Sequence, residues 1–363
     1  MSESVPVRQV SRTRIPALLL TTSLALLALS GCESPPPPPP PVVAEAPPPP
    51  PPPPVLLPRG VVELASLYEN YVNQAAVIDP AFTTGDKVQD SLKTAEHYKS
   101  SQLQQGQTAY GAIVALQDPT FKATLREFAK DAAQRTEIAN KILAEPSYAA
   151  SFKGADSAAG LVIAAFSDQG KKLIDTGARI KQAAYDVQHQ PWSKADVPDR
   201  PGRLALAKSL SDEDQKAIEV DTLRLSQNAS GAAAMGLAAP PVAPPYTTLV
   251  SRALAVAALA ALGEGGDEYS PQLTALLADT VEGQCLRLAK LNLYQCLSVA
   301  KPNYEDVFCL GQHAVGETGQ CLMKGAVAGY VIPPPIAPAA AETSKPQPVA
   351  TKHKVRKKAA TKG

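Results

Sequence analysis

Two unbroken proline runs near the N-terminus set the strongest limit on what this chain can fold into. They span Pro35–Pro41 and Pro47–Pro54. Because proline fixes φ and has no backbone N–H, neither run can continue a helix or a sheet ladder. We expect residues 32–58 to form an extended polyproline II spacer, at about 3.1 Å per residue. The alternative is a docking site for a partner whose aromatic groove binds PxxP, although no basic residue flanks the runs before Arg59.

The segment before the spacer has the layout of an export signal. Arg8, Arg12 and Arg14 make a basic start, and Ile15–Leu29 is mostly apolar. This apolar stretch has the length of a signal core and is too short for a transmembrane helix. It leads into the sequence LSGC, whose cysteine is Cys32.

The LSGC sequence resembles the lipobox of bacterial lipoproteins. The resemblance implies that residues 1–31 are a cleaved signal peptide and that Cys32 carries the lipid that holds the protein on a membrane. Several acyl chains hold a protein stably, whereas one holds it only marginally. Glu33 follows the cysteine, and by resemblance to Gram-negative lipoproteins this implies the periplasmic face of the outer membrane. An ordinary secretory signal with an incidental cysteine is the alternative.

The composition of residues 59–330 favours helices. Aromatic residues make up only 5% of the chain and alanine is abundant, which favours helices packed through small residues over strands. We expect an all-α fold, a helical bundle in one or two subdomains. A segment of mostly Ala, Gly and Pro at 229–245 predicts a linker between domains at 59–228 and 246–330. Within the second domain, Ala253–Leu262 predicts a buried helix.

Local signals predict several helix ends. Asp118 precedes a proline, which is typical of an N-cap, and apolar residues then recur at helical spacing as far as Glu145, which again precedes a proline. Residues 158–187 predict a helix that the Asp-Gln-Gly at 168–170 could break. Ser211 is predicted to cap a helix that begins in the acidic residues after it.

Four cysteines lie in the last third of the chain, and an even number in an exported protein predicts disulfides. Leu286–Val299 predicts a helix, Lys301–Asn303 a turn, and a second helix follows. In an antiparallel hairpin the two inner cysteines lie near the turn and the two outer ones near the open ends. Of the three possible pairings we therefore expect the nested one, Cys296 with Cys309 and Cys285 with Cys321.

The spacing of these cysteines suits a hairpin with one irregularity. Cys285 and Cys296 are eleven residues apart, close to three helical turns, whereas twelve residues separate Cys309 from Cys321 and rotate the second thiol away. Gly311 and two further glycines lie between them and could absorb this by a local bend. The arrangement resembles the twin-cysteine helical hairpins of oxidising compartments in architecture, with different spacings.

A metal site is the alternative for the cysteines, with His313 as an additional ligand. Structural zinc sites have Cys pairs two to four residues apart, and these cysteines are not so spaced. We therefore predict disulfides and no metal, with His313 on a polar helix face.

Motifs of known enzyme classes are largely missing. The sequence has no GxSxG, HExxH, Walker A or GxGxxG. Ser298–Lys301 matches the SxxK of penicillin-binding proteins and β-lactamases, but their companion motifs KTG and SDN are absent. We expect no catalytic residue and no cofactor.

The only tryptophan, Trp192, follows a polar segment that contains His189. One hypothesis is a recognition surface in which Trp192 stacks on a glycan ring and His189 hydrogen-bonds to it. The other is a helix end at Pro191, with Trp192 packing back on the bundle, and we favour this one.

The tail, residues 331–363, is predicted to be disordered and is basic from Glu342 onward. Removing the signal peptide and this tail leaves an acidic body. In the periplasm a cationic tail can contact lipopolysaccharide or the anionic cell wall; without interleaved aromatics it does not suit nucleic acid. A solubilising tail with no target is the alternative. The tail residues that would make the contact are Lys354, Arg356, Lys357 and Lys358.

Two function classes follow from these features. The first, which we favour, is a lipid-anchored envelope protein of structural, tethering or assembly role, with an unknown protein partner. The second is a cell-wall-active enzyme or ligand-binding lipoprotein whose site is assembled only in three dimensions.

Overall fold

The computed structural model describes residues 51–333. They form fourteen α-helices and no strand, with one isolated β-bridge between Asp196 and Pro302. The expected all-α fold is confirmed. The export signal, Cys32, most of the proline spacer and the basic tail lie outside these residues. No helix between residues 51 and 333 is both long and apolar enough to cross a membrane.

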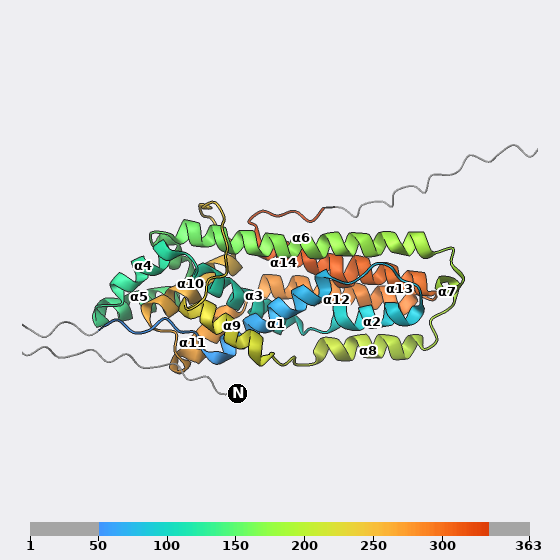
Figure 1. Ribbon diagram of the computed structural model, residues 1–363, viewed down its shortest axis with the longest axis horizontal. Coiled ribbons are helices and arrows are strands. Elements are labelled where there is room, and N and C mark those ends of the chain that lie inside the picture. Colours follow the sequence, from blue (N-terminus) through green and yellow to red (C-terminus); the bar gives the residue numbers. More distant parts are fainter. Residues whose placement is uncertain (1–50, 334–363) are drawn as a thin grey trace, which may run out of the picture. The chain divides into compact units, whose positions relative to one another are not determined.

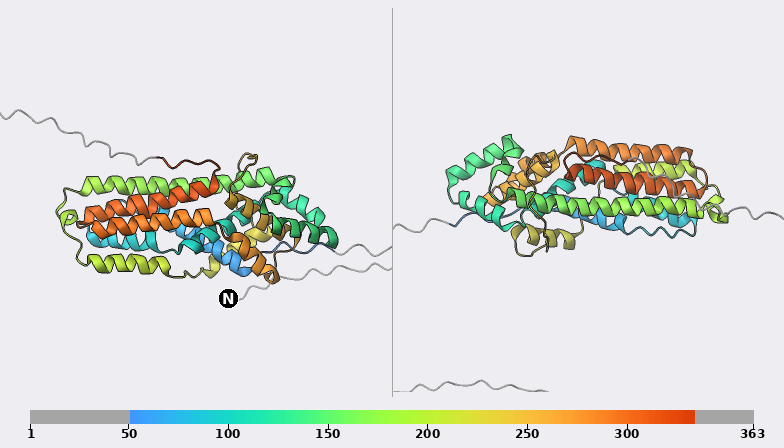
Figure 2. Two further views of the ribbon diagram at one scale, coloured as in Figure 1. Left: turned by 180° about the vertical axis from the view of Figure 1, so that it is seen from behind. Right: turned by 90° about the horizontal axis from the view of Figure 1, so that it is seen from above.

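The helices follow one another along the chain, and many of them lie side by side (Figures 1 and 2). The first seven are α1 (Arg59–Ala76), α2 (Gly85–Glu96), α3 (Ser100–Ala115), α4 (Pro119–Phe128), α5 (Ala132–Ala144), α6 (Ala155–Val187) and α7 (Pro191–Lys194). The next seven are α8 (Arg200–Asp212), α9 (Glu219–Ser230), α10 (Thr248–Leu262), α11 (Ser270–Leu277), α12 (Thr280–Val299), α13 (Asn303–Cys309) and α14 (Thr318–Ala326). Short 3₁₀ turns, η1 (Pro146–Ser151) and η2 (Asp267–Tyr269), and a π-helical segment, η3 (Leu310–Glu317), complete them.

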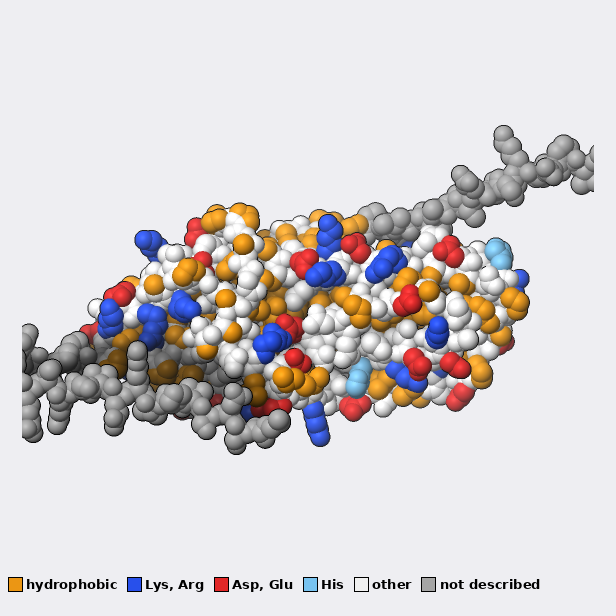
Figure 3. Space-filling view, in the orientation of Figure 1, with side chains coloured by type: hydrophobic (Ala, Val, Ile, Leu, Met, Phe, Trp, Pro, Cys, Tyr) orange, Lys and Arg blue, Asp and Glu red, His pale blue; other side chains and the backbone are white. Residues whose placement is uncertain are grey.

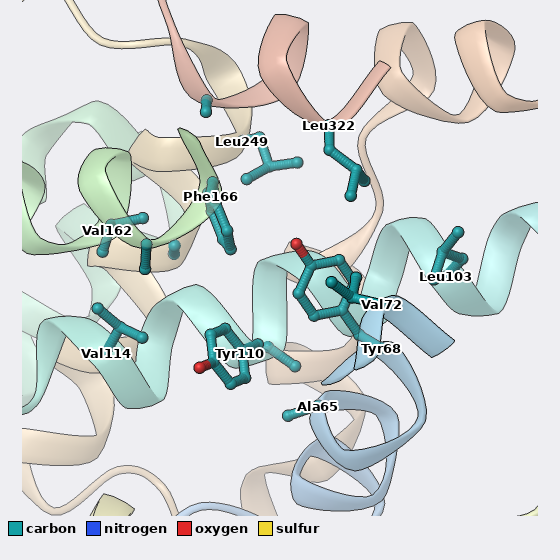
Figure 4. Close-up of a cluster of buried hydrophobic side chains, with 14 of the residues drawn as sticks. Ala65, Tyr68, Val72, Leu103, Tyr110, Val114, Val162, Phe166, Leu249 and Leu322 are labelled. Atoms are coloured by element: carbon teal, nitrogen blue, oxygen red, sulfur yellow. The ribbon is translucent and has the colours of Figure 1, made fainter. Parts of the chain in front are cut away.

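The core is centred on α3 and α10, which are buried over most of their length. Side chains from α1, α3, α6, α10 and α14 meet there (Figure 4). The Tyr68 ring of α1 lies 5.6 Å from that of Tyr110 in α3 and 6.0 Å from that of Phe166 in α6, measured between centroids. Leu249 of α10 and Leu322 of α14 complete this cluster. The predicted buried helix at Ala253–Leu262 is the inner part of α10, and all of its residues are buried.

The predicted linker at 229–245 joins helices that share this one core. Its residues after Ser230 are not helical, as its composition suggests. The structure differs from the expected pair of domains because α10, which follows the segment, packs directly on α3, which precedes it. The segment itself is held at Gly160 of α6, where an added Cβ would lie only 2.1 Å from the carbonyl oxygen of Pro240.

Several predicted helix ends agree with the structure. Asp118 caps α4 by accepting a hydrogen bond from the backbone N–H of Phe121, with proline in the first turn. α5 ends at Ala144, directly before Glu145 and its proline. One long helix was expected between these points, but Asp131 starts a new one by capping α5 through the N–H of Gln134, which divides the stretch in two.

Two further predictions concern α6 and Ser211. The helix predicted at 158–187 is confirmed as part of α6, which runs unbroken over 33 residues, so the possible break at 168–170 does not occur. At Gly170 an added Cβ would lie 2.8 Å from Met323 Cγ of α14. The absence of a side chain at this position therefore lets α6 and α14 pack closely. Ser211 does not cap a following helix. It lies in the last turn of α8, and α9 begins only at Glu219.

Candidate functional site

Two disulfides brace the hairpin that α12 makes with α13, η3 and α14. Cys285 pairs with Cys321 and Cys296 with Cys309, with Cα atoms 5.6 and 5.7 Å apart. This is the nested pairing expected from the hairpin. All four thiols are consumed, so none is left to bind a metal. Among residues 51–333, no group of three or more His, Cys, Asp or Glu side chains is placed to hold a metal ion.

The π-helical segment η3 accommodates the extra residue between Cys309 and Cys321. In a π-helix the backbone hydrogen bonds join residues i and i+5, so each turn is wider than in an α-helix and each residue adds a smaller rotation about the helix axis. The sulfur atoms of Cys309 and Cys321 can then both face α12. The same segment packs tightly on α6: a Cβ on Gly177 would lie 2.6 Å from the carbonyl oxygen of Gly311. Glycine at this crossing lets the two backbones touch.

A buried polar cluster lies on the other face of α12. Lys290, in the middle of that helix, donates to Ser211 Oγ at 2.9 Å, to Glu96 Oε2 at 3.2 Å and to the Glu96 carbonyl at 3.1 Å. Ser211 Oγ in turn lies 2.9 Å from Glu96 Oε2. The Lys290 and Glu96 side chains are only 6% and 1% exposed. Three helices, α2, α8 and α12, therefore meet at one ion pair.

Burial governs the charges of this pair. It raises the pKa of Glu96, with Lys290 and Ser211 acting in the opposite direction. It lowers the pKa of Lys290, against the attraction of Glu96. The Lys290 ammonium also lies 3.5 Å from the centroid of the Tyr98 ring, a position that favours a cation.

The contact between Ser211 and Lys290 resembles a nucleophile and its base, but its bonds indicate a structural role. A general base must accept the serine proton, whereas Lys290 donates three hydrogen bonds and lies over an aromatic face as a cation. A surface cavity of about 320 Å³ is lined by Ser211, Lys290 and Tyr294 among others. The serine of the SxxK match is elsewhere: Ser298 is exposed and donates to the carbonyl of Gln295.

A second buried ion pair fixes the turn end of the hairpin. Arg203 of α8 pairs with Asp306 of α13, and their side chains are 4% and 0% exposed. Gln89 of α2 donates to the other carboxylate oxygen at 2.9 Å. Arg203 also donates to the carbonyl of Leu297 near the end of α12. Burial raises the pKa of Asp306 while Arg203 lowers it.

The structure also places the residues that the sequence singled out. Trp192 is in α7, half-buried against the core, and its carbonyl accepts a hydrogen bond from Asn303 at 3.1 Å. His189 is exposed just before α7. His313 lies 2.8 Å from Glu317, one turn along η3, and both side chains are partly buried. Cys32, Lys354, Arg356, Lys357 and Lys358 lie outside the described residues.

Sequence reasoning missed Glu96, Lys290, Arg203 and Asp306. Each is an ordinary charged residue on a helix, far in sequence from its partner, so no spacing links them. Comparisons with protein-family models, with curated proteins and with solved structures each found no match.

Proposed function

We propose that this protein is a lipid-anchored protein of the bacterial envelope, held at Cys32 on the periplasmic face of the outer membrane, with a structural, tethering or assembly role. The observation that carries the proposal is the pairing of the four body cysteines in two disulfides. Disulfides persist in oxidising compartments such as the periplasm. They leave Cys32 as the one remaining cysteine of the five in the sequence, and it lies in the LSGC sequence suited to lipidation.

The features around the body support a tether. The proline runs provide a stiff spacer after the anchor, with a reach on the order of 3 Å per residue. The basic tail beyond Glu342 supplies positive charge at the opposite end of the chain. Such a tail attracts polyanions such as lipopolysaccharide or the cell wall.

The body has the properties of a rigid element between these ends. Its charged side chains Lys290 and Arg203 are almost fully buried and are paired with carboxylates of the protein itself. One disulfide joins α12 to α14 and the other joins α12 to α13. On the face shown in Figure 3, acidic and basic side chains are interspersed, which suits a solvated surface more than a charged substrate groove.

The decisive experiment is to identify the mature N-terminus. We expect mass spectrometry of the membrane-extracted protein to show a chain that begins at an acylated Cys32. The variant Cys32→Ser should remain unprocessed or leave the lipid-modified fraction, while the paired-cysteine variant Cys296→Ala/Cys309→Ala should still be acylated. A wild-type protein cleaved elsewhere, or carrying no lipid, would refute the anchor.

The tethering role is tested by the tail. Deleting residues 342–363 should weaken binding of the chain to isolated envelope fractions and flatten its dependence on salt, because screened charge contacts weaken as ionic strength rises. If the shortened chain binds with the same salt dependence, the tail has no electrostatic target.

A further inference from the structure

A cavity of about 300 Å³ lies where α10 and α12 begin and α14 ends. Thr248 of α10 and its N-cap Thr247 line it, together with Glu282 of α12 and its N-cap Asp279. The end of α14 contributes Lys324. Its volume is at the lower end of the range for small-molecule sites. It lies apart from the Glu96–Lys290 cluster, and neither disulfide lines it.

Glu282 is the unusual member of this cavity. Glu282 is only 2% exposed, and its Oε1 atom has no hydrogen-bond partner within residues 51–333. Leaving a buried polar atom without a partner costs about 1–3 kcal/mol, and more for a charged one. Burial raises the pKa of Glu282 well above its ordinary value, and the nearby Asp279 carboxylate raises it further. A group of this kind in a native interior calls for an explanation.

Lys324 brings an exposed positive charge to the same cavity. It is exposed, and no ion pair to it is found in the described part of the chain. Its charge is nevertheless near enough to favour the ionised form of Glu282 and so to oppose the rise of that pKa. A buried carboxyl group and an exposed ammonium group thus line one cavity, and no ion pair joins them in the described part of the chain.

The wall beside Glu282 leaves no space for another side chain. A Cβ on Gly325 would lie 3.1 Å from Glu282 Oε2 and 3.2 Å from Leu249 Cδ1. The carbonyl of Gly325 is held by the Thr247 hydroxyl at 2.6 Å. This bond ties the end of α14 to the start of α10 beside Glu282.

We propose that this cavity binds a small zwitterion, with the ammonium of the ligand at Glu282 and its anionic group at Lys324. These two groups define the ligand, because a purely cationic molecule meets repulsion at Lys324, whereas a purely anionic one lacks the ammonium that Glu282 needs and is repelled by Asp279. Free amino acids and the phosphoethanolamine headgroup of a lipid share this chemistry. The site is independent of whether Cys32 is lipidated.

The titration of Glu282 provides a signature of binding. The groups near it are Asp279 on its own helix, Lys324 on α14, Tyr68 on α1 and Tyr330 after α14. Without a ligand, the raised pKa keeps the acid protonated to higher pH than an exposed glutamate. An ammonium at the carboxyl favours ionisation, so binding below that pKa releases a proton, and affinity rises with pH as long as the ligand ammonium stays charged.

The test is calorimetric titration of the purified full chain in detergent, with glycine and β-alanine as free amino acids and with soluble dihexanoyl phosphatidylethanolamine as the headgroup probe. Dihexanoyl phosphatidylglycerol, which lacks the ammonium, is the control lipid. We expect saturable binding of at least one zwitterion, with heats that differ between buffers of different ionisation enthalpy because a proton is released. Which probe binds identifies the source of the ligand.

Two variants and a matched control decide the role of the residues. Glu282→Gln keeps the shape and should bind at least tenfold more weakly while its circular dichroism stays native. Lys324→Met should also weaken binding, whereas Lys216→Met, which removes an exposed positive charge elsewhere, should not. The proposal is overturned if no zwitterion binds, if phosphatidylglycerol binds equally well, or if the Glu282 and Lys324 variants bind like the wild type.

Discussion

The Lys290 ammonium lies 3.2 Å from Glu96 Oε2 although 194 residues separate the two in sequence. Their pairing joins the end of α2 to the middle of α12, and Ser211 of α8 bonds to both. The ion pair therefore connects the N-terminal helices to the disulfide hairpin through groups that are almost fully buried.

Removing one member of this pair should be far more costly than removing a surface charge. We expect Lys290→Met to lower the free energy of unfolding by about 3–5 kcal/mol, because Glu96 is left buried without its counter-charge. The matched control is Lys93→Met, whose partner Asp90 is exposed, and its loss should be about 0–1 kcal/mol. Urea unfolding measures both. Adding Glu96→Gln to the Lys290 variant should recover part of the loss; strictly additive losses would show that the pair does not interact.

Glu282 should make stability depend on pH. Its folded-state pKa is raised above the ordinary 4.5, so the folded state favours the protonated acid. The stability it contributes is complete below pH 4.5 and is lost as pH rises through the raised pKa, at about 1.4 kcal/mol for every pH unit that separates the folded and unfolded pKa values. The Glu282→Gln variant cannot ionise at this position. In urea unfolding measured at a series of pH values, we therefore expect its free energy of unfolding relative to that of the wild type to increase as pH rises across this window. The exposed control Glu268→Gln should follow the wild type; an identical curve for the Glu282 variant would contradict the buried acid.

The two disulfides should differ in their contribution to stability. The Cys285–Cys321 bond closes a span of 36 residues and the Cys296–Cys309 bond one of 13. Chain entropy then predicts losses of about 3.8 and about 2.9 kcal/mol when each pair is replaced by alanine. Guanidinium unfolding under non-reducing conditions compares the two variants. A reductant should bring the wild type below either of them, and no effect of reductant would mean that the bonds do not form.

The contact of α6 with η3 should be intolerant of a methyl group. Gly177→Ala places a Cβ 2.6 Å from the Gly311 carbonyl, so the helices must separate, and we expect a loss of about 1–3 kcal/mol. The control is Gly60→Ala in α1, where nothing lies within 4 Å. There alanine should be neutral or stabilising, by up to about 1 kcal/mol. The unfolding temperatures of the two variants measure the difference. Equal changes in the two would show that α6 and η3 do not approach closely at Gly177.

Where local chemistry decides the outcome, the sequence predicted the structure well. The cap at Asp118 and the stop before Glu145 are short-range signals, and both are found. The nested disulfides followed from helix spacing and one turn. Ser211 was misjudged because a serine followed by acidic residues is typical of a cap, whereas here its hydroxyl is used by Glu96 and Lys290 from distant helices.

By itself, the sequence determined the helical class, the hairpin with its cysteine pairing, and the helix ends that a capping side chain or a proline imposes. Tertiary structure alone decided that α3 and α10 share one core across the segment at 229–245, that Gly170 lies within an unbroken helix, and that Glu282 and Lys324 line one cavity. The physical reason is range: capping and proline act within a turn, whereas burial and charge pairing depend on which distant helices meet.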